Sequence, residues 1–77
     1  MSKGKLPVLN TEKLIRLLFQ VGFVPKRKKG SHLILVKDER RVVVPIHEGR
    51  DVPPGTLLSI IKQAGLSKKD FINLLKN

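Results

Sequence analysis

The sequence contains no cysteine, no tryptophan and no tyrosine, and each absence excludes a class of protein. Without cysteine there is no disulfide framework, no thiolate zinc site and no thiol nucleophile, which suits the reducing cytoplasm expected for this chain. The three phenylalanines, Phe19, Phe23 and Phe71, each lie among aliphatic residues, so all three are expected in the core. A sheet that stacks nucleic-acid bases on exposed aromatic side chains is therefore not expected.

Negative charge is scarce as well. The chain carries six Asp and Glu against sixteen Lys and Arg, which gives a net charge of +10 over 77 residues. A surface of this charge attracts polyanions, so nucleic acid is the expected class of partner. Because an aromatic platform is not expected, contact should run mainly through phosphate and ribose.

Long hydrophobic runs and the common catalytic motifs are also missing. Apolar stretches such as residues 42–46 are far too short to cross a bilayer, so no membrane association is expected. The chain has no G-x-S-x-G, Walker A or H-E-x-x-H motif, and no cofactor is expected. Its length suits one domain spanning residues 1–77.

The first half of the chain predicts a helix followed by three strands. Apolar residues at helical spacing, from Leu14 to Val21, predict a helix over residues 11–21 that is capped by Asn10 and ends at Gly22. Stretches rich in strand-forming residues, separated by short polar turns, predict strands over residues 23–28, 32–36 and 41–44, the last ended by Pro45. Apolar residues occur on both faces of the second and third strands, so alternation does not indicate which face the helices cover.

The second half predicts two helices. One begins at Pro54 and ends at Gly65, and a capping box from Ser67 to Asp70 begins a short last helix. Turns as short as those between the strands imply antiparallel pairing. The expected fold is therefore α+β, with a three-stranded antiparallel sheet covered by helices and a short C-terminal helix.

A run of four basic residues stands beside a glycine turn. It can be a solvated strand end that protects a sheet edge, or a site where cations and backbone N–H groups meet a phosphate. Two further arginines belong to the next hairpin and add charge to the same sheet. The candidate RNA-binding residues are Lys26, Arg27, Lys28, Lys29, Gly30, Ser31, Arg40 and Arg41.

His32 begins a predicted strand directly after this turn. It is either an ordinary polar surface residue or an imidazole held beside phosphate-binding cations. The second arrangement is what RNA cleavage requires, because a base must take the 2′-hydroxyl proton and an acid must protonate the leaving 5′-oxygen. His32 is the candidate catalytic residue.

His47 follows Pro45 in a loop and has two interpretations, a second acid–base group or a plain loop histidine beside Glu48. We favour the loop interpretation at this stage. No metal site is predicted, because with no cysteine and no helical pairing of histidine with carboxylates the usual ligand spacings are missing.

Several short motifs in order resemble the HicA toxins, also called the YcfA-like family. They cover residues 9–75 and read Gly22-Phe23, Gly30-Ser31-His32, Val44-Pro45 with His47, Pro54-Gly55-Thr56-Leu57 and Ile61-Lys62-Gln63-Ala64-Gly65-Leu66. The resemblance implies a fold similar to the double-stranded RNA-binding domain, α-β-β-β-α.

The resemblance also implies an activity and a partner. HicA proteins are mRNA interferases, the toxin half of toxin–antitoxin modules with a role in stress response, and their catalytic histidine corresponds to His32. Their partner is a HicB antitoxin. The sequence therefore predicts a metal-independent endoribonuclease acting on mRNA, and the alternative is a non-catalytic double-stranded RNA-binding module.

Overall fold

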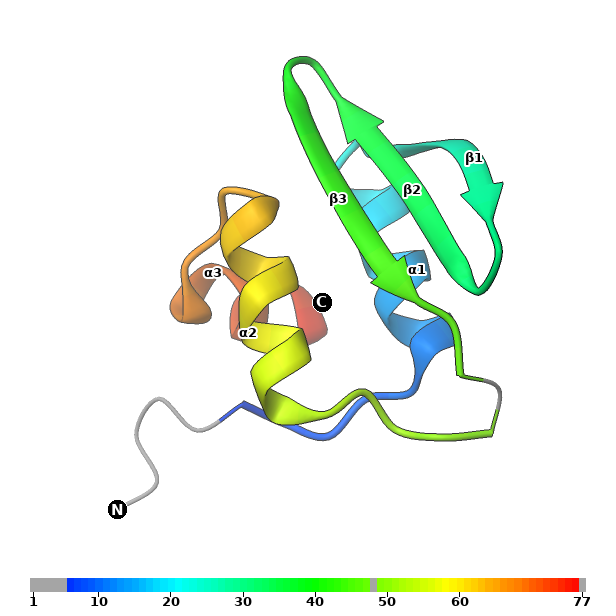
Figure 1. Ribbon diagram of the computed structural model, residues 1–77. Helices are drawn as coiled ribbons and strands as arrows, with labels where there is room; N and C mark the ends of the chain where they lie inside the picture. The colour runs from blue at the N-terminus through cyan, green and yellow to red at the C-terminus, as the bar shows by residue number, and fades with distance from the viewer. Residues whose placement is uncertain (1–5, 48, 77) are drawn as a thin grey trace.

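The structure, a computed structural model, describes residues 6–47 and 49–76. Three strands and three helices follow in the order α1-β1-β2-β3-α2-α3 (Figure 1). Their bounds are α1 Thr11–Gln20, β1 Val24–Lys29, β2 His32–Lys37, β3 Arg40–Pro45, α2 Pro54–Gln63 and α3 Lys68–Lys76. The predicted α+β order is confirmed, and the predicted element bounds differ from these by one residue at most ends.

Local signals set the helix ends as predicted. The Asn10 side chain accepts a hydrogen bond from the Lys13 N–H at 2.8 Å and caps α1. At the start of α3, the Asp70 N–H donates to Ser67 Oγ at 3.0 Å and the Ser67 N–H donates to Asp70 Oδ2 at 3.2 Å. This reciprocal pair is the predicted capping box.

The sheet is antiparallel throughout, in the order β1-β2-β3. Its register shows which face the helices cover, which the alternation of apolar and polar residues in the sequence did not indicate. Leu35 of β2 lies opposite Val42 of β3, and both are fully buried in the core. We call the opposite side the outer face, which carries His32, Ile34 and Val36 of β2 and their partners Pro45, Val43 and Arg41 of β3.

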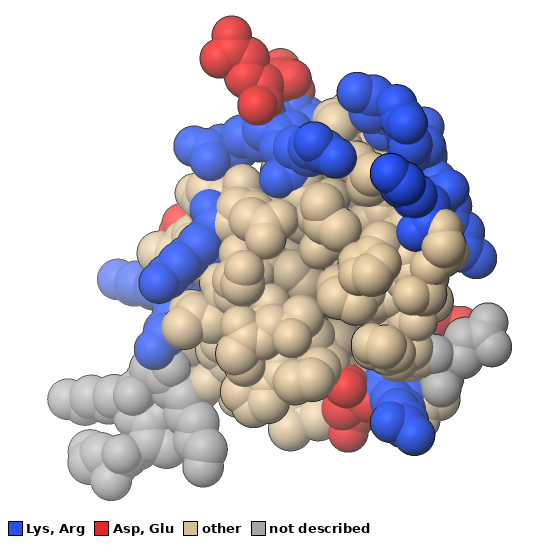
Figure 2. Space-filling view, in the orientation of Figure 1, with Lys and Arg blue, Asp and Glu red and all other residues tan. Residues whose placement is uncertain are grey.

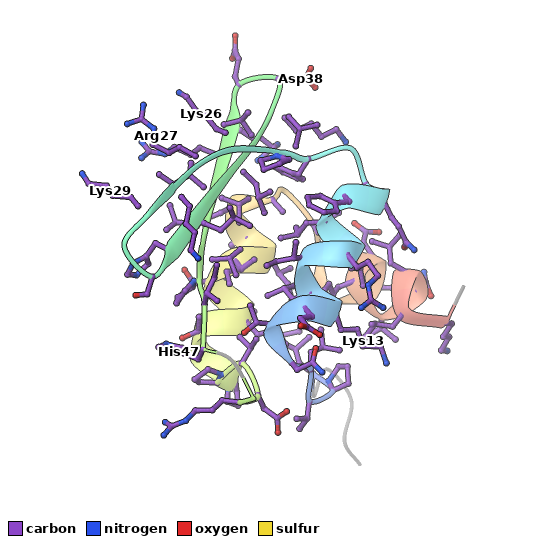
Figure 3. The ribbon with its side chains drawn as sticks, turned by 90° about the vertical axis from the view of Figure 1, so that its right-hand side faces the viewer. Lys13, Lys26, Arg27, Lys29, Asp38 and His47 are labelled. Carbon is purple, nitrogen blue, oxygen red and sulfur yellow. The ribbon has the colours of Figure 1, made fainter. Side chains whose placement is uncertain are left out.

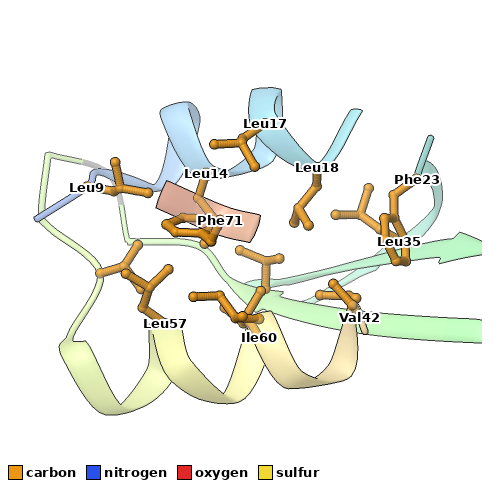
Figure 4. Packing of buried hydrophobic residues seen from close by; sticks show 14 residues of the cluster. Leu9, Leu14, Leu17, Leu18, Phe23, Leu35, Val42, Leu57, Ile60 and Phe71 are labelled. Carbon is orange, nitrogen blue, oxygen red and sulfur yellow. The ribbon is translucent and has the colours of Figure 1, made fainter. Parts of the chain in front are cut away.

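The core lies between α1, α2 and the helix side of the sheet (Figure 4). Leu14 and Leu18 of α1, Leu57 and Ile60 of α2, and Phe71 of α3 are each at most 1% exposed. Of the segments that the structure describes, no helix is long and apolar enough to span a membrane.

The core prediction is wrong for Phe19. Phe23 and Phe71 are buried, but Phe19 is 45% exposed. The buried stripe of α1 runs through Leu14, Leu17 and Leu18. The next residue along a helix points about 100° away, since a turn holds 3.6 residues, and Phe19 therefore faces solvent.

Candidate active site and nucleic-acid interface

His32 is exposed at the end of the sheet, where β1 turns into β2. Across the ladders it faces Lys29 of β1 on one side and Pro45 of β3 on the other. Residues directly opposite each other on paired strands lie about 5 Å apart at Cα and share a face. The imidazole thus has a cation as its cross-strand neighbour and open access to solvent.

The basic run forms β1, and all six residues of this strand are exposed. Arg27 and Lys29 pair with Ile34 and His32, so both cations share the outer face with the histidine. Figure 3 shows the side chains of Lys26, Arg27 and Lys29 projecting away from the helices. The strand pairing is irregular between Pro25 and Arg27, which leaves Lys26 as an extra residue in the ladder.

Gly30 gives the turn its shape and leaves room beside it. Its φ is +59°, in the left-handed region that favours glycine, and a Cβ added there would meet no atom within 4 Å. The space at this turn is therefore open, and a ligand can approach the backbone of Gly30 and Ser31 closely.

A shallow hollow lies next to this turn. It is lined by Lys28, Gly30, Ser31, Ile46, His47 and Arg50. The Ile46 N–H donates to the Ser31 carbonyl at 2.7 Å, which ties the β3–α2 loop to the β1–β2 turn. The Arg50 N–H donates to the His47 carbonyl at 3.2 Å and closes a turn within that loop. Two cations, one imidazole and one hydroxyl thus meet in a single hollow.

His47 also borders a second hollow, beside the first turn of α1. That hollow is lined by Glu12 and Asp51 together with Asn10, Thr11, Ile15, Ile46, His47 and Gly49. Its carboxylates repel phosphate, whereas the cations of the first hollow attract it. The structure therefore shows His47 between a cationic and an acidic surface, a position that its sequence neighbours did not predict.

The structure separates Arg40 from the rest of the predicted set, whereas Arg41, opposite Val36, shares the outer face with His32. Arg40 pairs with Lys37 at the far end of β2, five residues from His32. At about 3.4 Å per residue this is roughly 17 Å along the strand. The Arg40 guanidinium lies against Gly65, where any added Cβ would collide with it. The hairpin end also carries Asp38 and Glu39, so positive charge there is partly offset (Figure 2).

Arg50 is the residue that sequence reasoning missed. It stands alone among uncharged and acidic neighbours in a loop, and no motif marked it. Only the tertiary contacts of the loop bring it to the hollow that Lys28 also lines. Within residues 6–47 and 49–76, no three His, Asp or Glu side chains gather as a metal site would require.

Positive charge borders a neutral face on the side of the molecule seen in Figure 2. Lys and Arg side chains lie above and on both sides of a centre of uncharged residues in this view. The outer face of the sheet has uncharged residues of its own, Ile34 and Val43, which are buried and half-buried. A bound polyanion would therefore contact the rim of this face, where β1 and the hollow lie.

Comparison with known proteins identifies the family. No curated protein matches the chain. The profile of the family described as HicA toxin of bacterial toxin–antitoxin matches residues 11–66, a range that contains α1, the sheet and α2. It includes the Gly30-Ser31-His32 turn, His47 and Arg50. The match covers more than half of the sequence and confirms the resemblance drawn from its motifs, and the chain belongs to the HicA toxin family of bacterial toxin–antitoxin systems.

Proposed function

We propose that the protein is an endoribonuclease toxin that cleaves mRNA without a metal ion, with His32 as a general acid–base. The observation that carries this proposal is the exposed imidazole of His32, set directly opposite Lys29 at an open glycine turn. The family match supports the toxin role.

The proposed chemistry uses the ribose itself as the source of the nucleophile. His32 takes the proton of the 2′-hydroxyl, whose oxygen then attacks the adjacent phosphorus. The P–O5′ bond breaks, the leaving 5′-oxygen takes up a proton, and the protonated His32 releases its own to solvent. The products are a 2′,3′-cyclic phosphate and a 5′-hydroxyl. DNA lacks the 2′-hydroxyl, so it is not a substrate.

The cations near the turn supply electrostatic stabilisation. Negative charge grows on the non-bridging oxygens as the phosphorane forms, and Lys29 together with the backbone N–H groups of the turn is placed to offset it. One positioned acid–base group contributes about 10²–10⁴-fold to the rate, and one positioned donor about 10²–10³-fold. Multiplied together, these two rate enhancements are enough for a slow, regulated nuclease.

The proposed protein partner is a HicB-type antitoxin that covers His32 and the hollow. A chain of net charge +10 is met most favourably by an acidic surface, and charge complementarity speeds association. Covering His32 would exclude RNA from the same face, so contact alone would neutralise the toxin.

The test is cleavage of end-labelled RNA by purified protein in EDTA. Wild type should cleave and His32→Ala should lose at least about 100-fold in rate, while Lys69→Ala, changed on α3, should cleave as wild type does. Product ends should carry 2′,3′-cyclic or 3′-phosphate. RNA that stays intact with wild type after long incubation would instead establish a binding module, and equal cleavage by His32→Ala would remove its catalytic role.

A further inference from the structure

The proposed reaction needs two proton transfers, and His32 alone supplies one group. A base must remove the 2′-hydroxyl proton while an acid protonates the 5′-oxygen, and the two oxygens lie on opposite sides of the phosphorus. The hollow beside the turn holds a second imidazole, His47, that the proposed function does not use. This histidine is therefore the candidate for the second proton transfer.

We propose that His47 is the general acid of this reaction and that Lys28 and Arg50 hold the scissile phosphate in the hollow. The inference rests on the proposed function and deepens it, because it assigns the second half of the proton transfer. It also reverses the interpretation of His47 as a plain loop histidine.

The backbone keeps the two histidines close. His32 lies opposite Pro45, and His47 follows Pro45 by two residues. With about 5 Å between paired Cα atoms and at most about 3.6 Å per residue, their Cα atoms are no more than roughly 13 Å apart. Only Gly30 and Ser31 separate His32 along the chain from Lys29, and Lys28 comes one residue earlier. His32 lies on the outer face opposite Lys29, and His47 lines the hollow with Lys28, so a phosphate at this open turn lies between the outer face and the hollow.

The loop that carries His47 is anchored at several points before any ligand arrives. Ile46 bonds the turn through Ser31, Arg50 bonds back to His47, and the Val52 N–H donates to the Leu9 carbonyl at 2.7 Å. Gly49, with φ of +73°, allows the sharp reversal between His47 and Arg50. A loop held in this way positions its groups without a large ordering cost on binding.

The neighbours of each histidine divide the two roles. Carboxylates of Glu12 and Asp51 line the second hollow beside His47 and can accept a hydrogen bond from an imidazolium. Lys29, opposite His32, has donors alone and cannot do so. His47 therefore gives its proton to the 5′-oxygen as the P–O5′ bond breaks, and His32 holds the proton taken from the 2′-hydroxyl. Solvent restores both rings afterwards.

The experiment compares two RNA oligonucleotides that contain one cleavage site mapped with wild type. One has the natural 5′-oxygen at that linkage, and the other has a bridging 5′-sulfur, whose thiolate leaves without protonation. In single-turnover assays, His47→Ala should be about 10²–10⁴-fold slower than wild type on the oxygen substrate and within about tenfold of wild type on the sulfur substrate. His32→Ala should be slow on both.

Two controls separate this inference from folding and from the proposed function. His47→Gln should repeat the result of His47→Ala, and both should match wild type in thermal midpoint and in affinity for a 2′-O-methyl oligonucleotide. Wild-type rates for His47→Ala on the oxygen substrate, or equal defects on both substrates, would overturn the acid role and leave His32 as proposed. No cleavage of either substrate by wild type would overturn the proposed function, and this inference with it.

Discussion

At the scale of single residues, position on the sheet decides what each cation can do. The sequence groups Lys29 and Arg40 as equivalent candidates, but the register puts Lys29 directly across from His32 and Arg40 at the opposite end of β2. Arg40 also lies against Gly65 at the end of α2, where a positive charge is favourable near the helix C-terminus. We therefore expect these two basic residues to differ in function although both lie opposite residues of β2.

The comparison of Lys29→Ala with Arg40→Ala tests this difference. Lys29→Ala should slow cleavage by about 10-fold or more and lower the slope of log affinity against log salt by about 0.7, the value for one phosphate contact on a single strand. Arg40→Ala, with the same change in charge, should alter the cleavage rate less than about twofold, because its distance from His32 exceeds a Debye length of about 8 Å at physiological salt.

Cleavage rates and salt titrations of RNA affinity provide the measurement. Lys69→Ala on α3 serves as the control for a lost charge elsewhere on the surface. Equal losses for Lys29→Ala and Arg40→Ala would mean that RNA extends along the whole of β2, and the assignment of the site to one end of the sheet would then be wrong.

At the scale of elements, the two edges of the sheet are protected in different ways. At the outer edge of β3, the Val43 N–H donates to Gln63 Oε1 of α2 at 3.1 Å, and Pro45 has no N–H to offer. The edge at β1 carries Lys26, Arg27, Lys28 and Lys29. Lysines at an edge discourage pairing with other chains, so the basic run serves the fold whether or not it also binds RNA.

Two glycines, one in α2 and one directly after it, test how much the backbone conformation at the end of α2 contributes to stability. Gly65 has φ of +78°, so the backbone strains an alanine placed there. The Arg40 guanidinium lies where the Cβ would be, but this end of a flexible side chain can move aside at little cost. Gly65→Ala should destabilise the fold by about 1–2 kcal/mol, which lowers the thermal midpoint of a chain of this size by roughly 5–15 °C. Gly55→Ala is the matched control.

Gly55 lies in the first turn of α2, and a Cβ added there would meet nothing within 4 Å. Gly55→Ala should therefore keep or raise the midpoint, since alanine restricts the unfolded chain more than glycine does. Circular dichroism melts of both variants provide the measurement. A Gly65→Ala protein as stable as wild type would show that the backbone at the end of α2 relaxes freely.

Local signals explain which parts of the elements could be predicted. Asn10, the Ser67–Asp70 pair and the turn glycines act within a few residues, so the sequence alone located the helix starts and the strand turns. The sheet register depends on pairing between segments, and Val42, Val43 and Val44 look alike in sequence although only two of them face the core. The hollow was missed for the same reason, because Lys28 and Arg50 meet through the tie between Ser31 and Ile46.

At the scale of the whole molecule, the net charge of +10 opposes folding while it favours binding of polyanions. Some of the positive charges destabilise the fold without contributing to the proposed site. Lys68 and Lys69 are exposed in the first turn of α3, where the helix dipole is positive and cations are unfavourable. The start of α3 lies on the other side of α2 from the end of β3 (Figure 1).

The double variant Lys68→Gln/Lys69→Gln tests this separation of stability from function. Removing two like charges from the positive end of α3 should stabilise the fold at low salt by about 0.5–1 kcal/mol, a rise in the thermal midpoint of roughly 2–8 °C. Added NaCl screens the same repulsion, so the midpoint of wild type should approach that of the variant as salt increases. Cleavage at physiological salt should be unchanged within about twofold, because α3 supplies no residue to the hollow or to the strand pair that carries His32. Thermal melts across a salt series and parallel cleavage assays provide the measurement. A difference in midpoint between variant and wild type that persists at 1 M NaCl would mean that helix propensity, not charge repulsion, causes the stabilisation. A large loss of cleavage would mean that the RNA interface extends to α3.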